Sequence, residues 1–143
     1  MAYEFQIAVD SPEPHKLADW WAETLGWRLE PQDENFIKEM IAKGYASEAD
    51  TLQHNGNLVW RAGQALRHPE DLPGAPRVLF QYSPDAKTVK NRMHLDLRLG
   101  GEDRDAVRDR LIARGATFLW QGSQGPQVWY TMADPEGNEF CVS

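Results

Sequence analysis

The chain contains a single cysteine, Cys141, among its 143 residues, so an internal disulfide is excluded and nothing indicates an oxidising compartment. Long apolar runs are absent: no stretch approaches the roughly 20 residues that a membrane-spanning helix needs. The N-terminal residues lack the charged-then-apolar pattern of a signal peptide. Basic residues are outnumbered by acidic ones, 15 to 22, and the net charge of −7 disfavours nucleic acid as a partner. These absences predict a cytoplasmic protein with neither a membrane nor a nucleic acid as its partner.

The first half begins with a strand and a helix. Apolar and polar residues alternate over residues 5–9, which predicts a half-buried strand. Residues 10–13 then offer a capping side chain, a proline and an acidic residue, all favourable where a helix starts. Apolar residues recur at helical spacing until Gly26, which ends the helix. A short strand over 27–30 follows, and then a helical insertion at about 33–50.

The second half repeats this order. Further strands are predicted in the first half over 58–61, 63–66 and 77–83, the first of them after a hairpin signal at Asn55-Gly56. In the second half we predict a strand over 93–99, a helix over 103–114, and strands over 116–121, 127–132 and 138–142. The chain therefore reads as one domain over 1–143, with a first module at about 1–84 and a second at about 90–143.

Two short segments carry the candidate chemistry. Residues 91–97 (Asn-Arg-Met-His-Leu-Asp-Leu) alternate as a strand with His94 and Asp96 on its polar face. Residues 134–140 (Asp-Pro-Glu-Gly-Asn-Glu-Phe) form a tight turn before a strand in which Glu139 lies opposite Phe140. A histidine and a glutamate on the polar faces of two strands are a candidate metal-binding or acid–base pair.

With these two segments and the aromatic-rich helix that ends at Gly26, the chain resembles the vicinal oxygen chelate superfamily, in its glyoxalase-like or bleomycin-resistance-like branch. The resemblance implies an α+β fold. Two βαβββ modules form an open barrel of mixed sheets around a ligand cavity, with the helices outside. In metal-dependent members each module supplies two ligands, one from its first strand and one from its last.

Carried over residue by residue, the resemblance assigns the first-strand positions to Gln6 and His94 and the last-strand positions to Gln81 and Glu139. Strand alternation independently gives these four side chains the polar faces of their strands. The implied cofactor is a divalent metal such as zinc, nickel, iron or manganese. Two of the four residues are neutral glutamines, which are weak donors, so the set would hold a metal less tightly than a charged one. An iron triad of two histidines and a carboxylate is not available from these positions.

A second group of residues is predicted to line the cavity: Trp60, Trp120, Trp129, Asp96 and Arg98. Each also has a structural interpretation, because the tryptophans could be core residues and Asp96 could pair with Arg98 or orient His94. His94 itself could simply be bonded to a neighbour on its strand. Cys141 is expected on the face of Glu139, as a small buried side chain, and His15 on an exposed helix surface.

Two functions fit this sequence. The first is a small-molecule enzyme in which a metal polarises a carbonyl or hydroxyl while Glu139 moves a proton, which suits a lyase or an isomerase. The alternative is a metal-free protein that binds and sequesters an aromatic drug or metabolite. In both, the partner is a small molecule. A homodimer is also expected, because the modules leave sheet edges that need covering.

Overall fold

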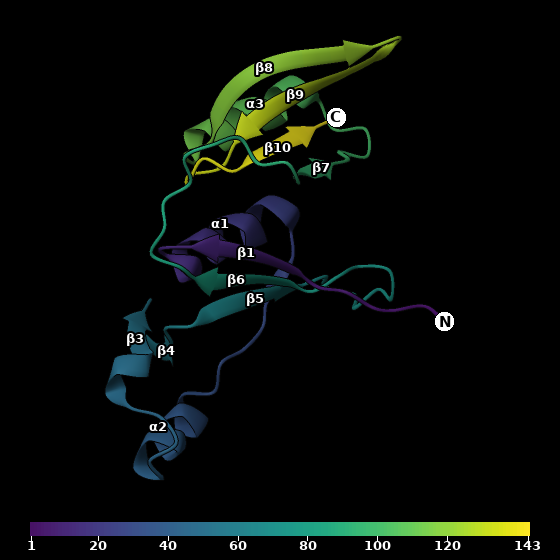
Figure 1. The fold of residues 1–143 in the computed structure, drawn as a ribbon. Coiled ribbons are helices and arrows are strands. Elements are labelled where there is room, and N and C mark those ends of the chain that lie inside the picture. The colour runs from purple at the N-terminus through teal and green to yellow at the C-terminus, as the bar shows by residue number, and fades with distance from the viewer. The chain divides into compact units, whose positions relative to one another are not determined.

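The computed structural model describes residues 1–143 and divides into two compact units, module 1 (Met1–Asp85) and module 2 (Ala86–Ser143) (Figure 1). The elements of module 1 are β1 (Ile7–Ser11), α1 (Pro14–Leu25), β2 (Arg28–Leu29), α2 (Glu34–Ala42), a 3-10 turn η1 (Glu48–Asp50), β3 (Thr51–His54), β4 (Asn57–Trp60), β5 (Gly63–Arg67) and β6 (Val78–Tyr82). Those of module 2 are β7 (Leu95–Leu97), α3 (Arg104–Ala113), β8 (Thr117–Gln124), β9 (Gln127–Ala133) and β10 (Glu139–Val142). No helix is long and apolar enough to span a membrane.

The two modules have the same topology. Module 1 has a four-stranded sheet in the order β1-β6-β5-β2, and module 2 has one in the order β7-β10-β9-β8. In each sheet the first strand of the module runs parallel to the last, and the remaining neighbours are antiparallel. This is the α+β fold with a twofold strand–helix–strand order that the sequence predicts.

One face of each sheet is buried by the helix of its own module. Strand alternation sends the apolar side chains to that face. The buried cores include Leu17, Trp20, Trp21, Leu66, Val78 and Phe80 in module 1, and Val107, Leu111, Tyr130, Met132, Phe140 and Val142 in module 2. The opposite face of each sheet is therefore left for polar side chains.

The strands that open each module begin two residues later than predicted. β1 begins at Ile7, so Phe5 lies outside it and is 73% exposed. β7 begins at Leu95, so Met93 also lies outside its strand and is 90% exposed. The first helix starts at Pro14 rather than near Pro12, because Ser11 accepts a hydrogen bond from the Glu13 N–H in a turn that precedes it.

The insertion in module 1 is longer and less helical than predicted. It contains α2 and η1, and it continues through β3 and β4, which form a two-stranded sheet of their own. The predicted turn at Asn55-Gly56 joins these two strands, with both residues at positive φ. The chain on either side of the insertion is already paired, because the Glu30 N–H donates to the Ala65 carbonyl at 2.9 Å. The four-stranded sheet consequently keeps the order found in module 2.

The prediction that His15 is exposed was wrong. His15 is 4% exposed, and its Nε2–H donates to the Trp60 carbonyl at 2.7 Å, which fastens the β3–β4 hairpin to α1. The ring of His54 lies 5.2 Å from that of His15, and Asp19 pairs with His54 at 2.6 Å. Burial lowers the pKa of His15, against the hydrogen bond to Trp60 that raises it, with the nearby His54 lowering it further.

Because the pKa of His15 is lower in the folded protein than its ordinary value of 6.5, the unfolded chain binds more protons as the pH falls below that value. We expect the free energy of unfolding to fall from about pH 7.5 to about pH 5.5, and to fall less in His15→Gln, which keeps a donor near the Trp60 carbonyl but does not titrate. Urea denaturation at the two pH values measures both slopes. Equal slopes in the two proteins would show that His15 does not contribute.

Candidate functional site

The polar face of the module 2 sheet gathers most of the predicted site residues. Pairing places Cys141 beside Asp96 on one side and Thr131 on the other, on the face opposite the buried Phe140 and Val142. The residues that share this face by register or alternation are His94, Asp96, Trp120, Trp129, Thr131, Glu139 and Cys141. Cys141 and Glu139 thus lie on one face, as predicted.

The Glu139 carboxylate is held by two donors from the segment before β7. Lys87 Nζ donates to Oε1 at 2.8 Å, and the Asn91 N–H donates to Oε2 at 3.1 Å. The side chains of Lys87 and Glu139 are only 19% and 10% exposed. Burial alone raises the pKa of Glu139, but the hydrogen bonds from Lys87, from Asn91 and from its own backbone, with the charge of Lys87, outweigh burial and lower it. Lys87 was missed because it lies in a segment that carries no strand or helix pattern.

His94 is paired within its own strand segment. Its Nδ1 lies 2.9 Å from Asp96 Oδ1. Of the two interpretations of Asp96, an ion pair with Arg98 or orientation of His94, the structure supports the second. Cys141 completes a cluster with these two residues, and Thr131 Oγ1 lies 3.4 Å from its sulfur. Burial and the Asp96 carboxylate raise the pKa of the Cys141 thiol, against a hydrogen bond with Thr131 that lowers it.

The strand register in module 1 corrects one predicted ligand position. Val78 pairs with Ile7, which places Arg77 beside Gln6, whereas Gln81 pairs with Asp10 four residues farther along β1. At about 3.3 Å a residue, that is roughly 13 Å from Gln6. In module 2, where Phe140 pairs with Leu95, the same step places Glu139 beside His94. The residue that corresponds to Glu139 in module 1 is therefore Arg77 and not Gln81.

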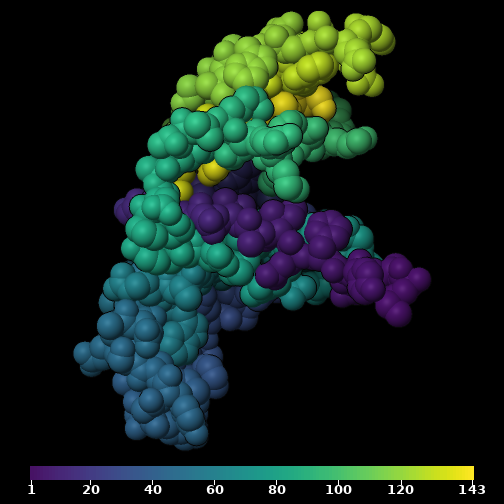
Figure 2. All heavy atoms as spheres, in the orientation of Figure 1, coloured from purple at the N-terminus to yellow at the C-terminus, as the bar shows by residue number.

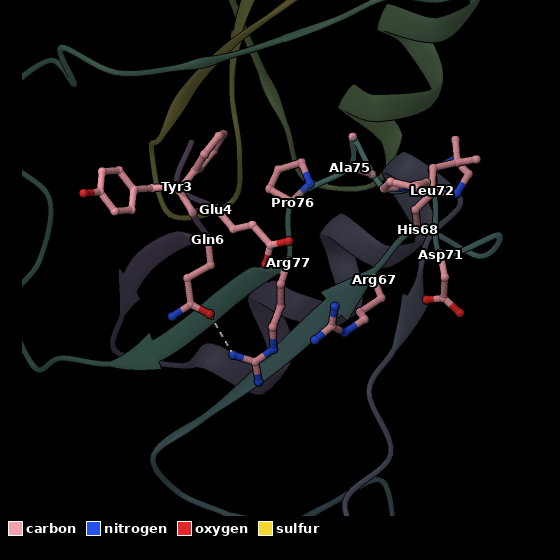
Figure 3. A pocket seen from close by; sticks show the side chains of 13 residues that line it. Tyr3, Glu4, Gln6, Arg67, His68, Asp71, Leu72, Ala75, Pro76 and Arg77 are labelled. Carbon is pink, nitrogen blue, oxygen red and sulfur yellow. Dashed lines mark hydrogen bonds between the residues drawn. The ribbon is translucent and has the colours of Figure 1, made fainter. Parts of the chain in front are cut away.

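All three nitrogens of the Arg77 guanidinium donate hydrogen bonds within module 1. Its Nε and Nη2 donate to the two oxygens of Glu30 at 2.6 and 3.1 Å, and its Nη1 donates to Gln6 Oε1 at 3.0 Å (Figure 3). Arg67 Nε also donates to Glu30, at 2.9 Å. The hydrogen bonds from Arg77 are the first cause of the lowered pKa of Glu30, against burial. Gln81 makes a separate contact and donates to Asp10 at 3.3 Å.

Gln6 and Arg77 border a cavity of about 630 Å³ within module 1 (Figure 3). It is lined by Tyr3, Glu4, Phe5, Gln6, Arg67, His68, Asp71, Leu72, Pro73, Gly74, Ala75, Pro76 and Arg77. The N-terminal segment on one side of it is exposed, as the purple spheres of Figure 2 show. The predicted cavity residue Trp60 lies elsewhere, on β4 in the two-stranded sheet.

Comparisons with known proteins identify the family of this chain. The model of the glyoxalase-like domain matches residues 6–143. The chain belongs to the glyoxalase-like family. One of the similar solved structures is described as a member of the glyoxalase, bleomycin resistance protein and dioxygenase superfamily. No curated protein matches the chain.

Several solved structures share the fold at low identity. The fosfomycin resistance protein FosX from Listeria monocytogenes is 9% identical with a TM-score of 0.62, over 99% of this chain and 92% of that one. The hypothetical protein SA1046 from S. aureus is 10% identical, with a TM-score of 0.61, over 99% and 93%. A superfamily member from Sphaerobacter thermophilus is 18% identical, with a TM-score of 0.56, over 99% and 96%.

The four residues at the metal positions that the resemblance implies do not fit a divalent cation as a set. In module 1 the pair is Gln6 and Arg77, and a guanidinium has no lone pair to offer a metal. In module 2 the Lys87 ammonium lies 2.8 Å from Glu139 Oε1, so a metal cation on this carboxylate would meet a like charge. Module 1 therefore has a protein cation, Arg77, beside Gln6, and module 2 has one, Lys87, on Glu139.

Removing Lys87 should raise the pKa of Glu139. In Lys87→Met the burial of the carboxylate remains while its charged donor is lost, so the pKa is expected to move toward or above its ordinary value of 4.5. Carbon-detected NMR titration of the Glu139 carboxyl measures the shift. Lys43→Met removes an exposed lysine paired with Glu39 in α2 and should leave Glu139 unchanged. An unshifted pKa in Lys87→Met would contradict the role of this lysine.

Gly122 gives Trp129 its place on the polar face. A Cβ at Gly122 would lie 2.4 Å from Cε2 of the Trp129 ring, so Gly122→Ala must displace the indole. We expect a loss of about 1–3 kcal/mol in the free energy of unfolding and a change in tryptophan fluorescence. Urea denaturation measures the first. Ser123→Ala, on the same strand, should change neither, and an unchanged fluorescence in Gly122→Ala would contradict this packing.

Proposed function

We propose that this chain is a small-molecule-binding protein that does not use the family's metal, and that its ligands are small organic anions with an apolar part. The observation that carries the proposal is Arg77, which stands beside Gln6 where the family resemblance implies a metal ligand. In module 2 the hydrogen bond from Lys87 to Glu139 also supports the proposal. Both contacts put positive charge where metal-assisted chemistry needs a free donor. The lyase or isomerase activity thus finds no support in these residues, and it stays a prediction.

The cavity of module 1 supports an anionic ligand. Arg77 and Arg67 share the single carboxylate of Glu30, which leaves one positive charge in excess among these three residues. Arg67 contacts Glu30 through Nε, so its two terminal nitrogens remain available to a ligand. Of the acidic residues that line the cavity, Asp71 is paired with Arg28 at 2.5 Å, and Glu4 lies on the exposed N-terminal segment. A guanidinium fork suits a carboxylate, phosphate or phosphonate group.

The same cavity supports an apolar part of the ligand. Tyr3 and Phe5 line it and are 85% and 73% exposed, so both rings can gain by covering a ligand. Leu72 and two prolines, Pro73 and Pro76, add apolar surface. Its volume of about 630 Å³ lies within the range of about 300–1,000 Å³ that is usual for small-molecule sites. The open barrel, the homodimer and the cytoplasmic location stay predictions.

Phenylphosphonate is a suitable probe, with benzyl alcohol as its neutral counterpart. We expect calorimetry to show binding of phenylphosphonate but not of benzyl alcohol, equally with and without EDTA. Arg67→Gln should weaken binding at least about 10-fold, because hydrogen bonds to charged groups contribute about 1.5–3 kcal/mol. Arg110→Gln, an arginine of similar exposure on α3, should leave the affinity unchanged.

Binding that disappears in EDTA would overturn the metal-independent part of the proposal. An affinity equal in Arg67→Gln and in the unsubstituted protein would overturn the assignment to the module 1 cavity.

A further inference from the structure

We propose that His94, Asp96 and Cys141 form a binding site for a thiophilic divalent cation such as zinc on the polar face of module 2. Their ligand atoms, one from each residue, all lie within 4.8 Å of one another. Only His94 belongs to the positions implied by the family resemblance. The other two ligands are a carboxylate two residues farther along the same segment and a thiol on the neighbouring strand.

The parallel pairing of β7 with β10 brings the three residues together. Cys141 is directly opposite Asp96, and His94 lies on the same face two residues before Asp96. β10 is an inner strand of the sheet, and its buried neighbours Phe140 and Val142 fix Cys141 in place. Donors on packed strands are held more accurately than donors on loops.

The donor set suits zinc. Imidazole nitrogen, carboxylate oxygen and thiolate sulfur are its usual ligands, at about 2.0–2.3 Å, which places donors in a tetrahedron about 3.3–3.8 Å apart. Closing the present spacing to that range needs movements of about 1 Å. The side chains of His94 and Asp96 are 36% and 65% exposed, so both have the freedom to make them. With three protein ligands, a tetrahedral ion has a fourth position for water or for a ligand.

Binding of the ion releases one proton. Zinc displaces the hydrogen of the Cys141 thiol to solvent as the metal–sulfur bond forms, because only the thiolate is a ligand. When Nδ1 of the neutral His94 binds the ion, its hydrogen bond with Asp96 is replaced and its proton resides on Nε2. Thr131, 3.4 Å from the sulfur, can then donate its hydroxyl hydrogen to the thiolate.

This inference stands apart from the proposed function, which concerns module 1 and positions held by Arg77 and Lys87. The two can fail separately. Phenylphosphonate binding in EDTA tests the first, and the spectrum of a bound metal tests the second.

Cobalt(II) is the probe, because a thiolate bound to cobalt gives a charge-transfer band in the near ultraviolet. The full chain, reduced and freed of metal by chelation, is titrated with cobalt chloride. Because Cys141 is the only cysteine, the band reports on this residue alone. We expect the band to appear with a ratio of one cobalt per chain, and zinc to displace the cobalt and abolish it.

Three variants make the test specific. Cys141→Ser should abolish the band while circular dichroism shows a folded chain, and Asp96→Asn should weaken cobalt binding more than about 10-fold, the least that removal of a ligand's supporting partner costs. Glu139→Gln should leave cobalt binding unchanged.

Absence of the charge-transfer band in the unsubstituted protein overturns the proposal. Loss of binding in Glu139→Gln also overturns it, because the ion would then occupy the family positions. If Cys141→Ser does not fold, Asp96→Asn decides, and unchanged binding there overturns the proposal.

Discussion

The parallel contact between the first and last strands of each module is the constraint on which the other features depend. In a βαβββ unit the helix carries the chain over the sheet, and the last strand returns to lie beside the first. Residues separated by 45 or 71 positions in sequence consequently become direct neighbours, as Leu95 and Phe140 or Ile7 and Val78 do. The pairs at the start of these strands occupy corresponding places, Gln6 with Arg77 and His94 with Glu139. Chemistry at these places therefore depends on which two residues the register joins.

The residue pair at the start of the parallel strands differs between the two modules. In module 1 the arginine is part of the scaffold, because it joins the first strand to the segment after β2 through Glu30 and Gln6. In module 2 the pair is a histidine and a glutamate, and each has a partner of its own: Asp96 for His94 and Lys87 for Glu139. Buried or half-buried carboxylates need compensating charge, and here protein side chains provide it.

Strand alternation predicted the faces of module 2 well, because burial of Phe140 and Val142 dictates where Glu139 and Cys141 must lie. It could not distinguish Gln81 from Arg77, since a face is shared by every second residue and only the register says which residue meets Gln6. The contact between Lys87 and Glu139 could not be predicted for another reason. It spans 52 residues, and Lys87 lies in no helix or strand. His15 was placed on the surface because the hairpin that covers it belongs to the insertion, whose strands form a separate sheet.

The insertion itself has a consequence for how such domains diversify. Its two ends meet at hydrogen bonds between Glu30 and Ala65 and between the Gln32 side chain and the Gly63 carbonyl. A segment anchored in this way can be lengthened, exchanged or removed while the host sheet keeps its strand order. The junction between β2 and β5 is thus the place where the chain can vary in length, and a chain closed there by a short turn would approach the strand order of module 2 but would uncover His15, which the hairpin now buries.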